Sequence, residues 1–309
     1  MDRVVTGILG DRLVVAAPTP IRADESLDLD AFALMVDRDI ARGVEGVYVA
    51  GSSGEGLLLS TDERIALTRS AVEAAGERVP VYAHVGALST REAISLAEAA
   101  REAGAAAISM IPPLYYKYSA AEVVAHFRAV IDAVDIPFIL YNIPQFTGRD
   151  ISDGGFEGLL ELSQVVGIKH TSQNLYGAER LIQRYPHLTL INGFDELYLP
   201  ALSIGARGAI GTTIGLQIEL FRSLRARHAR GDVDGARTVQ TRINDTVQAL
   251  VQEGVFAAAK YLAGKQSTPL GTCRRPLPGL DDDARRRLDV VWDRLRENVC
   301  STSTEDASM

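Results

Sequence analysis

The strongest constraint on the fold is a regular alternation of short apolar runs with longer stretches of helical periodicity. The runs are rich in β-branched residues and recur at intervals of roughly 20 to 35 residues, which is typical of strands that alternate with amphipathic helices. They predict eight strands, near residues 13–16, 46–50, 81–85, 106–110, 137–141, 165–169, 189–192 and 209–212. Such alternation implies parallel strands with crossover helices. About eight of them favour a closed (β/α)8 TIM barrel over an open sheet.

Helix starts support this assignment. Three predicted helices each begin with the serine and glutamate of a capping box, in which hydroxyl and carboxylate satisfy unpaired backbone amides. The pairs are Ser60 with Glu63, Ser89 with Glu92, and Ser119 with Glu122. Each pair follows shortly after a predicted strand, as a βα unit requires.

The chain divides into three predicted parts. Residues 1–220 form the barrel, and residues 221–298 form C-terminal helices packed on it, within stretches 226–251, 255–262 and 282–298. No proline- or glycine-rich linker separates the two parts. The last residues, 299–309, are small and polar and predict a disordered tail.

Composition narrows the class of partner. The 309-residue chain has a formal net charge of −8, which disfavours nucleic acid or an anionic membrane surface as a partner. No run approaches the roughly 20 apolar residues of a membrane-spanning helix. The five histidines show no ligand spacing and the two cysteines lie apart from them, so we expect no metal and no cofactor. The cysteine usage fits a reducing cytoplasm.

Lys169 is the most informative residue. It closes the apolar run 165–168 and is followed by a polar stretch. A lysine at the carboxyl end of a buried strand loses the hydration that its ammonium form needs, which frees an amine to attack a carbonyl as in Schiff-base enzymes. The alternative is a strand-end lysine that extends to water.

Other polar residues follow the remaining predicted strands, on the rim where barrel enzymes carry their chemistry. Ser52 and Ser53, between two glycines, suit a carboxylate or phosphate, or else form a tight structural turn. Glu55 takes the place of the last glycine of a Gly-x-Ser-x-Gly nucleophile elbow, which excludes that motif.

Tyr141 and the pair Asp195 and Glu196 have two interpretations each, and Tyr115 has one from the residues alone. Tyr141 is a proton relay beside the lysine or a core tyrosine with its hydroxyl at the edge. Tyr115 can be an exposed loop aromatic. Asp195 and Glu196 either hydrogen-bond substrate hydroxyls or open the next helix favourably against its dipole.

Several co-linear motifs together resemble the dihydrodipicolinate synthase and N-acetylneuraminate lyase superfamily over about residues 13–298. They are Gly51-Ser52-Ser53-Gly54-Glu55, Tyr141-Asn142-Ile143-Pro144, Lys169-His170-Thr171-Ser172 and Asn192-Gly193-Phe194-Asp195-Glu196. The resemblance implies a (β/α)8 barrel, usually a homotetramer, in which a lysine forms a Schiff base with pyruvate. It implies that Lys169 is that lysine and Tyr141 the proton relay, and that Ser52 and Ser53 hold the pyruvate carboxylate. Tyr115 resembles a tyrosine that reaches into a neighbouring subunit's site.

Within the superfamily the sequence is more similar to the lyases. Synthases carry an arginine two residues after the proline of the Tyr-Asn-x-Pro motif, whereas Phe146 stands here and offers no guanidinium for a carboxylate. The stretch 84–86, His-Val-Gly, resembles a lyase motif. The resemblance implies a sugar subsite made by Thr171, Gly193, Asp195, Glu196 and Thr212. We therefore expect cleavage of N-acetylneuraminate to pyruvate and a sugar-derived aldehyde, N-acetylmannosamine.

Alternatives remain open at this point. Phe194 stands where lyases commonly have tyrosine and Thr212 where they commonly have serine, so another keto-deoxy sugar acid is a competing substrate. A synthase of the same superfamily is a further alternative. A phosphate-binding barrel isomerase would use residues 208–215 but would leave Lys169 and Tyr141 without a shared role. A keto-acid sensor would keep the pocket without turnover.

Overall fold

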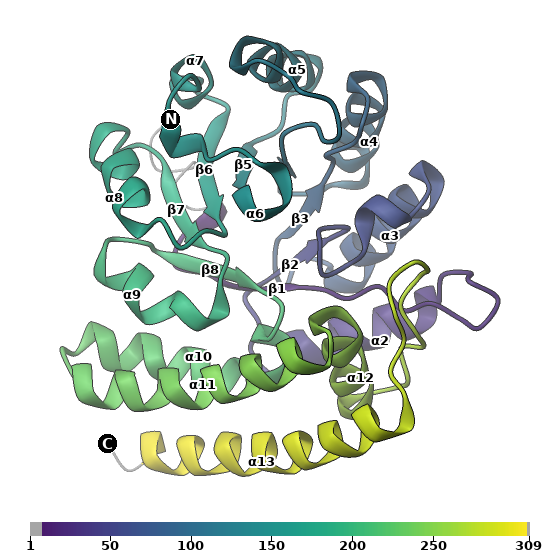
Figure 1. The fold of residues 1–309 in the computed structure, drawn as a ribbon, viewed down its shortest axis with the longest axis vertical. Helices are drawn as coiled ribbons and strands as arrows, with labels where there is room; N and C mark the ends of the chain where they lie inside the picture. The colour runs from purple at the N-terminus through teal and green to yellow at the C-terminus, as the bar shows by residue number, and fades with distance from the viewer. Residues whose placement is uncertain (1–7, 308–309) are drawn as a thin grey trace.

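The computed structural model describes residues 8–307, and within them eight parallel strands form a closed barrel (Figure 1). The last strand pairs with the first, so the (β/α)8 prediction is confirmed. Every strand lies within one residue of its predicted bounds. The strands are β1 (Leu13–Ala16), β2 (Gly46–Val49), β3 (Val81–His84), β4 (Ala107–Met110), β5 (Phe138–Asn142), β6 (Val165–His170), β7 (Thr189–Asn192) and β8 (Gly208–Gly211).

Helices surround this barrel, as Figure 1 shows. The longer ones are α2 (Leu29–Ala41), α3 (Thr61–Ala75), α4 (Thr90–Ala103), α5 (Ala120–Ala133), α8 (Leu175–Arg184) and α10 (Ile214–Ala229). The βα connections also contain short elements, namely η1 (Gly56–Leu58), α6 (Pro144–Thr147), η2 (Ile151–Asp153), α7 (Glu157–Leu160), η3 (Asp195–Leu197) and α9 (Tyr198–Ser203).

Two of the three predicted capping boxes form completely, those that begin at Ser60 and Ser119. At Ser89 only half of the box is present. The Ser89 hydroxyl accepts a hydrogen bond from the amide of Glu92, at 3.2 Å. The Glu92 carboxylate instead accepts from the hydroxyl of Thr61, at 3.1 Å. A contact between two neighbouring helices has thus replaced a local one.

The apolar side chains form two separate clusters. The larger cluster lies between the strands and the surrounding helices and extends into the C-terminal helices. The smaller cluster fills the barrel interior and contains Tyr48, Tyr82 and Tyr141. Leu9 joins the inner cluster, and the hydroxyl of Tyr82 donates to the carbonyl of Ile8 at 2.6 Å. The barrel interior is therefore a packed core that residues 8 and 9 help to close.

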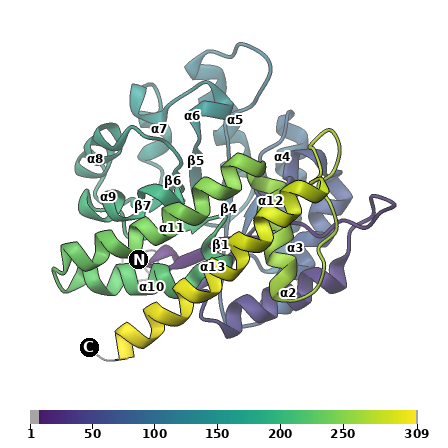
Figure 2. The same ribbon diagram turned by 60° about the horizontal axis from the view of Figure 1, so that its bottom comes forward.

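The C-terminal extension consists of α11 (Val233–Glu253), α12 (Val255–Gln266) and α13 (Asp282–Ala307), which pack on one another and on α10 (Figure 2). The predicted helix 226–251 is in fact two helices. Gly231 has a φ of 78°, which few other residues adopt, and Asp232 caps the next helix by accepting from the Gly235 amide at 2.9 Å. The expected division between residues 220 and 221 falls inside α10, so the barrel passes into the extension without a break.

The expected disordered tail is wrong over most of its length, because α13 continues to Ala307. Thr302 is fully buried, and its hydroxyl accepts a hydrogen bond from Arg242 at 2.8 Å. The same arginine pairs with Glu305 at 2.9 Å. Contacts with α11 therefore order a segment whose composition is that of a disordered one. Residues 308–309 lie outside the described residues.

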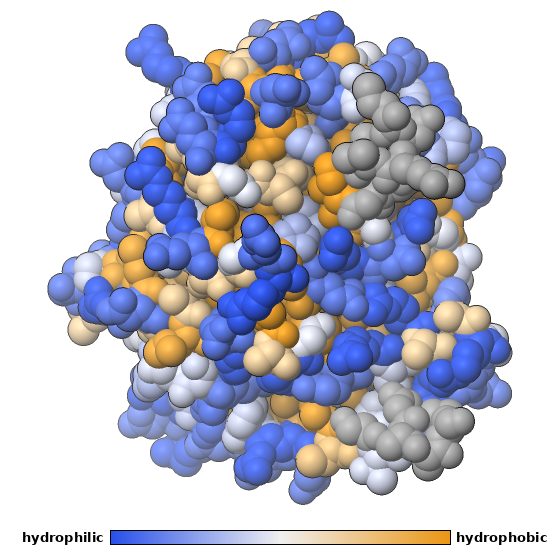
Figure 3. Space-filling view, turned by 180° about the vertical axis from the view of Figure 1, so that it is seen from behind, coloured by the Kyte–Doolittle hydropathy of each residue, from blue (hydrophilic) through white to orange (hydrophobic). Residues whose placement is uncertain are grey.

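Hydrophilic side chains dominate the face seen from behind in Figure 3, with hydrophobic residues scattered among them. None of the helices described between residues 8 and 307 has the length and apolar content needed to cross a membrane.

Candidate active site

Lys169 lies inside the barrel near the end of β6, and only 3% of it is exposed. It pairs in register with Tyr141 on β5, so the two side chains emerge side by side. The Lys169 Nζ lies 4.0 Å from the centroid of the Tyr141 ring and 4.2 Å from that of Tyr48 on β2. Among residues 8–307, no carboxylate forms an ion pair with this nitrogen. The amine is thus held by aromatic rings in a desolvated position.

A β-bulge in β6 turns Lys169 toward the barrel interior. Phe138 on β5 pairs with Val165, and the next residue on β5 pairs with Gly167, so Val166 is an extra residue. Val165 and Ile168 belong to the outer core, whereas Val166 belongs to the inner one. Strict alternation from Val165 would have directed Lys169 outward. The bulge reverses the alternation, as bulges beside active sites commonly do.

The amine faces a cavity of about 170 Å³ at the carboxyl ends of the strands. Nine of the ten site residues predicted from the sequence line it, and they come from the carboxyl ends of five strands or from the connections that follow them. They are Ser52, Ser53, Tyr141, Lys169, Thr171, Gly193, Asp195, Glu196 and Thr212. Residues that are far apart in the sequence therefore meet at one lysine.

The connections after the second and eighth strands meet through a hydroxyl pair. Ser53 Oγ and Thr212 Oγ1 are 2.6 Å apart, and either can donate the hydrogen bond. Ser52, beside them, also lines the cavity and is half-buried. This edge of the cavity offers several hydroxyl groups to an anionic ligand, consistent with a carboxylate subsite.

Asp195 is a buried carboxyl group at the cavity wall. Burial raises its pKa to about 6, although hydrogen bonds from the amide and hydroxyl of Thr213, at 2.7 and 2.8 Å, act in the opposite direction. The other carboxylate oxygen, Oδ1, is buried without a hydrogen bond to the described residues. A Cβ at Gly211 would lie 1.6 Å from that oxygen, so only glycine leaves room for it. Burial also raises the pKa of the neighbouring Glu196.

Thr171 and Gly193 are in close contact. A Cβ added to Gly193 would lie 1.9 Å from Thr171 Oγ1, so the glycine is required by a close approach. The Thr171 hydroxyl is buried and has no hydrogen-bond partner among the described residues. Together with Asp195 it supplies unused polar atoms at the cavity, as a site for a hydroxylated ligand requires.

Tyr115 is the one predicted site residue that the structure does not bring to the cavity of its own chain. It is 89% exposed, in the loop after β4, with a φ of 77°. Its ring packs edge-on against Tyr116, with centroids 5.0 Å apart. Any role of Tyr115 in catalysis therefore requires a second subunit.

Part of the cavity wall is apolar. Phe146 on α6 is 57% exposed and lines both the lysine cavity and an adjoining hollow of about 280 Å³. No guanidinium is present at this position, as the sequence indicates. His84 also borders the adjoining hollow, and burial lowers its pKa well below the usual range, with Arg64 and Lys169 acting in the same direction.

Sequence reasoning missed two contributions to the site. Tyr48 was absent from the predicted residues although it contacts the lysine nitrogen. The C-terminal extension supplies Val247, Val251, Val255 and Phe256 to the cavity wall. The apolar periodicity of these helices gave no signal for this role, because helix packing on the barrel requires the same residue types.

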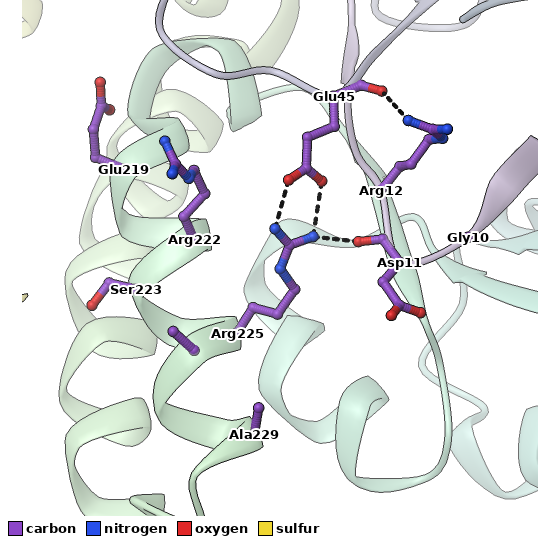
Figure 4. Close-up of a pocket in the computed structure, with 10 residues that line it drawn as sticks. Gly10, Asp11, Arg12, Glu45, Glu219, Arg222, Ser223, Arg225 and Ala229 are labelled. Carbon is purple, nitrogen blue, oxygen red and sulfur yellow. Dashed lines mark hydrogen bonds and ion pairs between the residues drawn. The ribbon is translucent and has the colours of Figure 1, made fainter. Parts of the chain in front are cut away.

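A larger hollow of about 990 Å³ lies at the opposite end of the barrel, where Arg12 and Glu45 precede β1 and β2 (Figure 4). Arg225 from α10 pairs there with both carboxylate oxygens of Glu45, at 2.8 and 2.6 Å, and also donates to the carbonyl of Asp11. This arrangement joins α10 to the strand starts. Barrel enzymes carry their chemistry at the other end, so we assign this hollow a structural role.

No group of three histidine, cysteine, aspartate or glutamate residues in the described part of the chain could hold a metal ion. The chemistry that the site offers comes from an amine, hydroxyls and carboxyl groups.

The fold and the cavity define a (β/α)8-barrel protein with a buried lysine at the carboxyl ends of its strands. Residues 10–294 match the Dihydrodipicolinate synthetase family, and the chain belongs to this family. The N-acetylneuraminate lyase of Rhizobium meliloti (strain 1021) is 40% identical over 264 residues, which cover 85% of this chain and 88% of that protein.

Two solved structures are similar to this chain in their three-dimensional fold. A Clostridium difficile protein solved in complex with mannosamine has a TM-score of 0.89 and 29% identity, over 92% of this chain and 98% of that one. A prophage protein of the dihydrodipicolinic acid synthase family from E. coli K12, solved in complex with pyruvate, has a TM-score of 0.84 and 29% identity over the same shares.

Proposed function

We propose that this protein is a Schiff-base aldolase that cleaves N-acetylneuraminate to pyruvate and N-acetylmannosamine, and is thus a carbon–carbon lyase. The observation that carries the proposal is the position of the Lys169 amine, buried between aromatic rings and facing a cavity lined by hydroxyl and carboxyl groups. Support also comes from a relative named as an N-acetylneuraminate lyase and from a family structure that contains pyruvate.

The first half of the reaction forms the imine. Ser52 and Ser53 bind the substrate carboxylate, which places the neighbouring ketone carbon against Lys169. The amine adds to that carbon, and the resulting carbinolamine loses its hydroxyl as water to give a protonated imine. The imine then acts as an acceptor for electrons from the bond that breaks.

The second half cleaves the carbon chain. Tyr141 relays the proton from the C4 hydroxyl while the C3–C4 bond breaks, and the bonding electrons move toward the imine to form an enamine. The C4 carbon leaves as the aldehyde. The enamine takes a proton at C3, and water hydrolyses the imine, which releases pyruvate and restores the free amine. No cofactor enters this sequence.

The sugar chain is bound on the polar side of the cavity. Asp195 and Glu196 accept hydrogen bonds from substrate hydroxyls, with Thr171, Gly193 and Thr212 beside them. A site built to bind hydroxyls rejects analogues that lack them, because its own polar groups would be left buried and unpaired. Phe146 cannot pair with a second carboxylate, so condensation of pyruvate with aspartate semialdehyde should be negligible.

Trapping of the pyruvate imine tests the proposed chemistry, and turnover of N-acetylneuraminate tests the proposed substrate. Borohydride reduction in the presence of pyruvate should leave a covalent adduct that peptide mapping places on Lys169. An adduct on Lys117, Lys260 or Lys265, or none at all, would refute the mechanism. Glu196→Ala should weaken cleavage of N-acetylneuraminate far more than it weakens trapping of pyruvate.

A second candidate substrate is a different keto-deoxy sugar acid. Phe194 lines the cavity and supplies no hydroxyl at a position where lyases commonly have one. Trapping without lyase activity, together with turnover of another such acid, would keep the mechanism and change the substrate. Trapping without turnover of any sugar acid would instead favour a keto-acid sensor.

We further propose a cytoplasmic homotetramer in which Tyr115 enters a neighbouring subunit's site. Support comes from the exposed side chains of Tyr115 and Tyr116, at 89% and 70%, because large exposed aromatic residues are enriched at interfaces. Both cysteines, Cys273 and Cys300, are free thiols, which fits a reducing compartment. Light scattering at micromolar concentration should give four subunits, and a monomer would remove the role of Tyr115 in trans.

A further inference from the structure

Tyr48 is an aromatic residue to which neither the family motifs nor the proposed reaction gives a role. It lies in β2 with 1% of its surface exposed, across the barrel interior from β6. The Lys169 Nζ is 4.2 Å from the centroid of its ring. The rings of Tyr48 and Tyr141 are 6.2 Å apart and nearly perpendicular, at 89°. The nitrogen of Lys169 therefore contacts two ring faces that are oriented at right angles.

The two tyrosines differ in what else they contact. Both tyrosines belong to the inner core, but only Tyr141 also lines the substrate cavity. A substrate bound to Lys169 would consequently meet Tyr141 and not Tyr48. Burial raises the pKa of the Tyr48 hydroxyl well above its usual range, so this group stays protonated. Any contribution of Tyr48 to the reaction must act through Lys169.

The ring face is the part of Tyr48 that can act on the lysine. An aromatic face carries a partial negative charge and attracts a cation held within about 6 Å, more strongly where water is excluded. Lys169 is cationic at two stages of the proposed reaction, as the ammonium and as the protonated imine. No carboxylate among the described residues forms an ion pair with Lys169.

We propose that Tyr48 is a positioning residue whose ring face holds the cationic nitrogen of Lys169 and sets the pH at which its free amine becomes available. The proposal rests on the proposed function for the imine stage only. The other ionisable groups around the nitrogen are Tyr141, whose ring it contacts, and His84, which burial and Arg64 keep neutral. The carboxyl groups of Asp195 and Glu196 line the cavity that the amine faces.

Substitutions separate the ring face from the hydroxyl. Tyr48→Phe keeps the face, so the pH midpoint for trapping pyruvate on Lys169 should stay within roughly 0.3 units of the wild-type midpoint. Tyr48→Leu removes the face and destabilises the cation, so the midpoint should move to lower pH by about one unit. Tyr82→Leu is the matched control, because Tyr82 pairs in register with Tyr48 inside the barrel and makes no ring contact with Lys169. It should leave the midpoint unchanged.

A second series of variants tests the proposal even if Tyr48→Leu does not fold. Phenylalanine analogues with increasing numbers of ring fluorines, placed at position 48, retain the shape of the ring while weakening the negative face. The midpoint should fall step by step along the series. A midpoint that stays constant or rises in the fluorinated series would overturn the proposal.

The readout can also be made independent of pyruvate. Cyanate carbamylates unprotonated amines, so its reaction with Lys169, followed by peptide mapping as a function of pH, reports the free amine directly. If the cyanate midpoint shifts as expected but pyruvate is never trapped, the role of Tyr48 stands and the proposed function fails. If pyruvate is trapped but neither midpoint responds to the fluorinated series, the function stands and the role of Tyr48 is refuted.

Discussion

The ammonium group of Lys260 and the carboxylate of Glu55 form an ion pair in which the two side chains are 1% and 0% exposed. Lys260 belongs to α12, and Glu55 lies two residues after Ser53. Lys260 also donates to the carbonyl of Thr272 at 2.9 Å, and Glu55 accepts from the amide of Arg274 at 2.7 Å. The C-terminal extension is thereby joined to the loop that carries the proposed carboxylate-binding serines.

Lys260→Met should strongly destabilise the protein. It would leave the Glu55 carboxylate buried without its partner, and loss of one member of a buried pair typically costs about 3–5 kcal/mol. Urea unfolding followed by circular dichroism measures the change. The double variant Lys260→Met/Glu55→Gln carries no unpaired charge and should be less destabilised than the single one. Asp234→Ala, which breaks the exposed pair with Arg237, is the surface control and should have little effect. A single variant as stable as the wild type would contradict a stabilising role for this ion pair.

Tyr141→Phe should lower turnover by roughly 100-fold or more, on the usual scale for acid–base groups. Only a hydroxyl is lost, so packing and imine trapping should remain. Tyr198→Phe is the control, because Tyr198 is also buried but does not line the cavity. The Tyr198→Phe variant should turn over at the wild-type rate. Steady-state kinetics would contradict the proton relay if both variants turned over at the wild-type rate.

Asp195→Asn should change how stability depends on pH. Burial raises the pKa of Asp195 in the folded protein to about 6, so folding favours the protonated form. The resulting stability is fully present below about pH 4 and is lost as the pH rises through 6. Asparagine stays neutral, so the variant should gain roughly 3 kcal/mol relative to the wild type between pH 4 and pH 7. Asp39, whose pKa burial also raises to about 6, is present in both proteins and cancels in the difference.

Chemical denaturation at a series of pH values measures this difference. A constant difference between Asp195→Asn and the wild type across that range would show that Asp195 titrates normally in the folded state.

Gly167→Ala should disturb the bulge in β6. A Cβ at this position would lie 2.6 Å from the backbone oxygen of Thr189 and 2.6 Å from the side chain of Leu9, and the backbone oxygen cannot easily move. We expect a loss of about 1–3 kcal/mol in stability and reduced trapping at Lys169. Gly158→Ala has no atom within 4 Å of its new Cβ and should be neutral. Equal stability and trapping in both variants would mean that the bulge tolerates a side chain.

The barrel and most of the site could be predicted from the sequence, because both follow from local chemistry. The apolar pattern changes between that of a strand and that of a helix along the chain, which marks each element. The carboxyl ends of parallel strands in a barrel all lie at the same end of it. Polar residues at the ends of those strands or shortly after them, such as Lys169, Ser53 and Asp195, are therefore expected to lie close together.

The amino-acid sequence by itself determined that these residues gather at one end of the barrel. Only the tertiary structure decided in which direction each side chain points. Lys169 faces inward only because an extra residue in β6 reverses the strand's alternation, and such a bulge depends on pairing with β5. Tyr48 meets the lysine from the opposite wall, a contact that strand periodicity cannot reveal. The helical end of α13 likewise exists because Arg242, 60 residues earlier, contacts Thr302. Long-range contacts of this kind decide the local structure even where the composition predicts another one. The free energy that they supply comes from residues far away in the sequence, which a local pattern does not include.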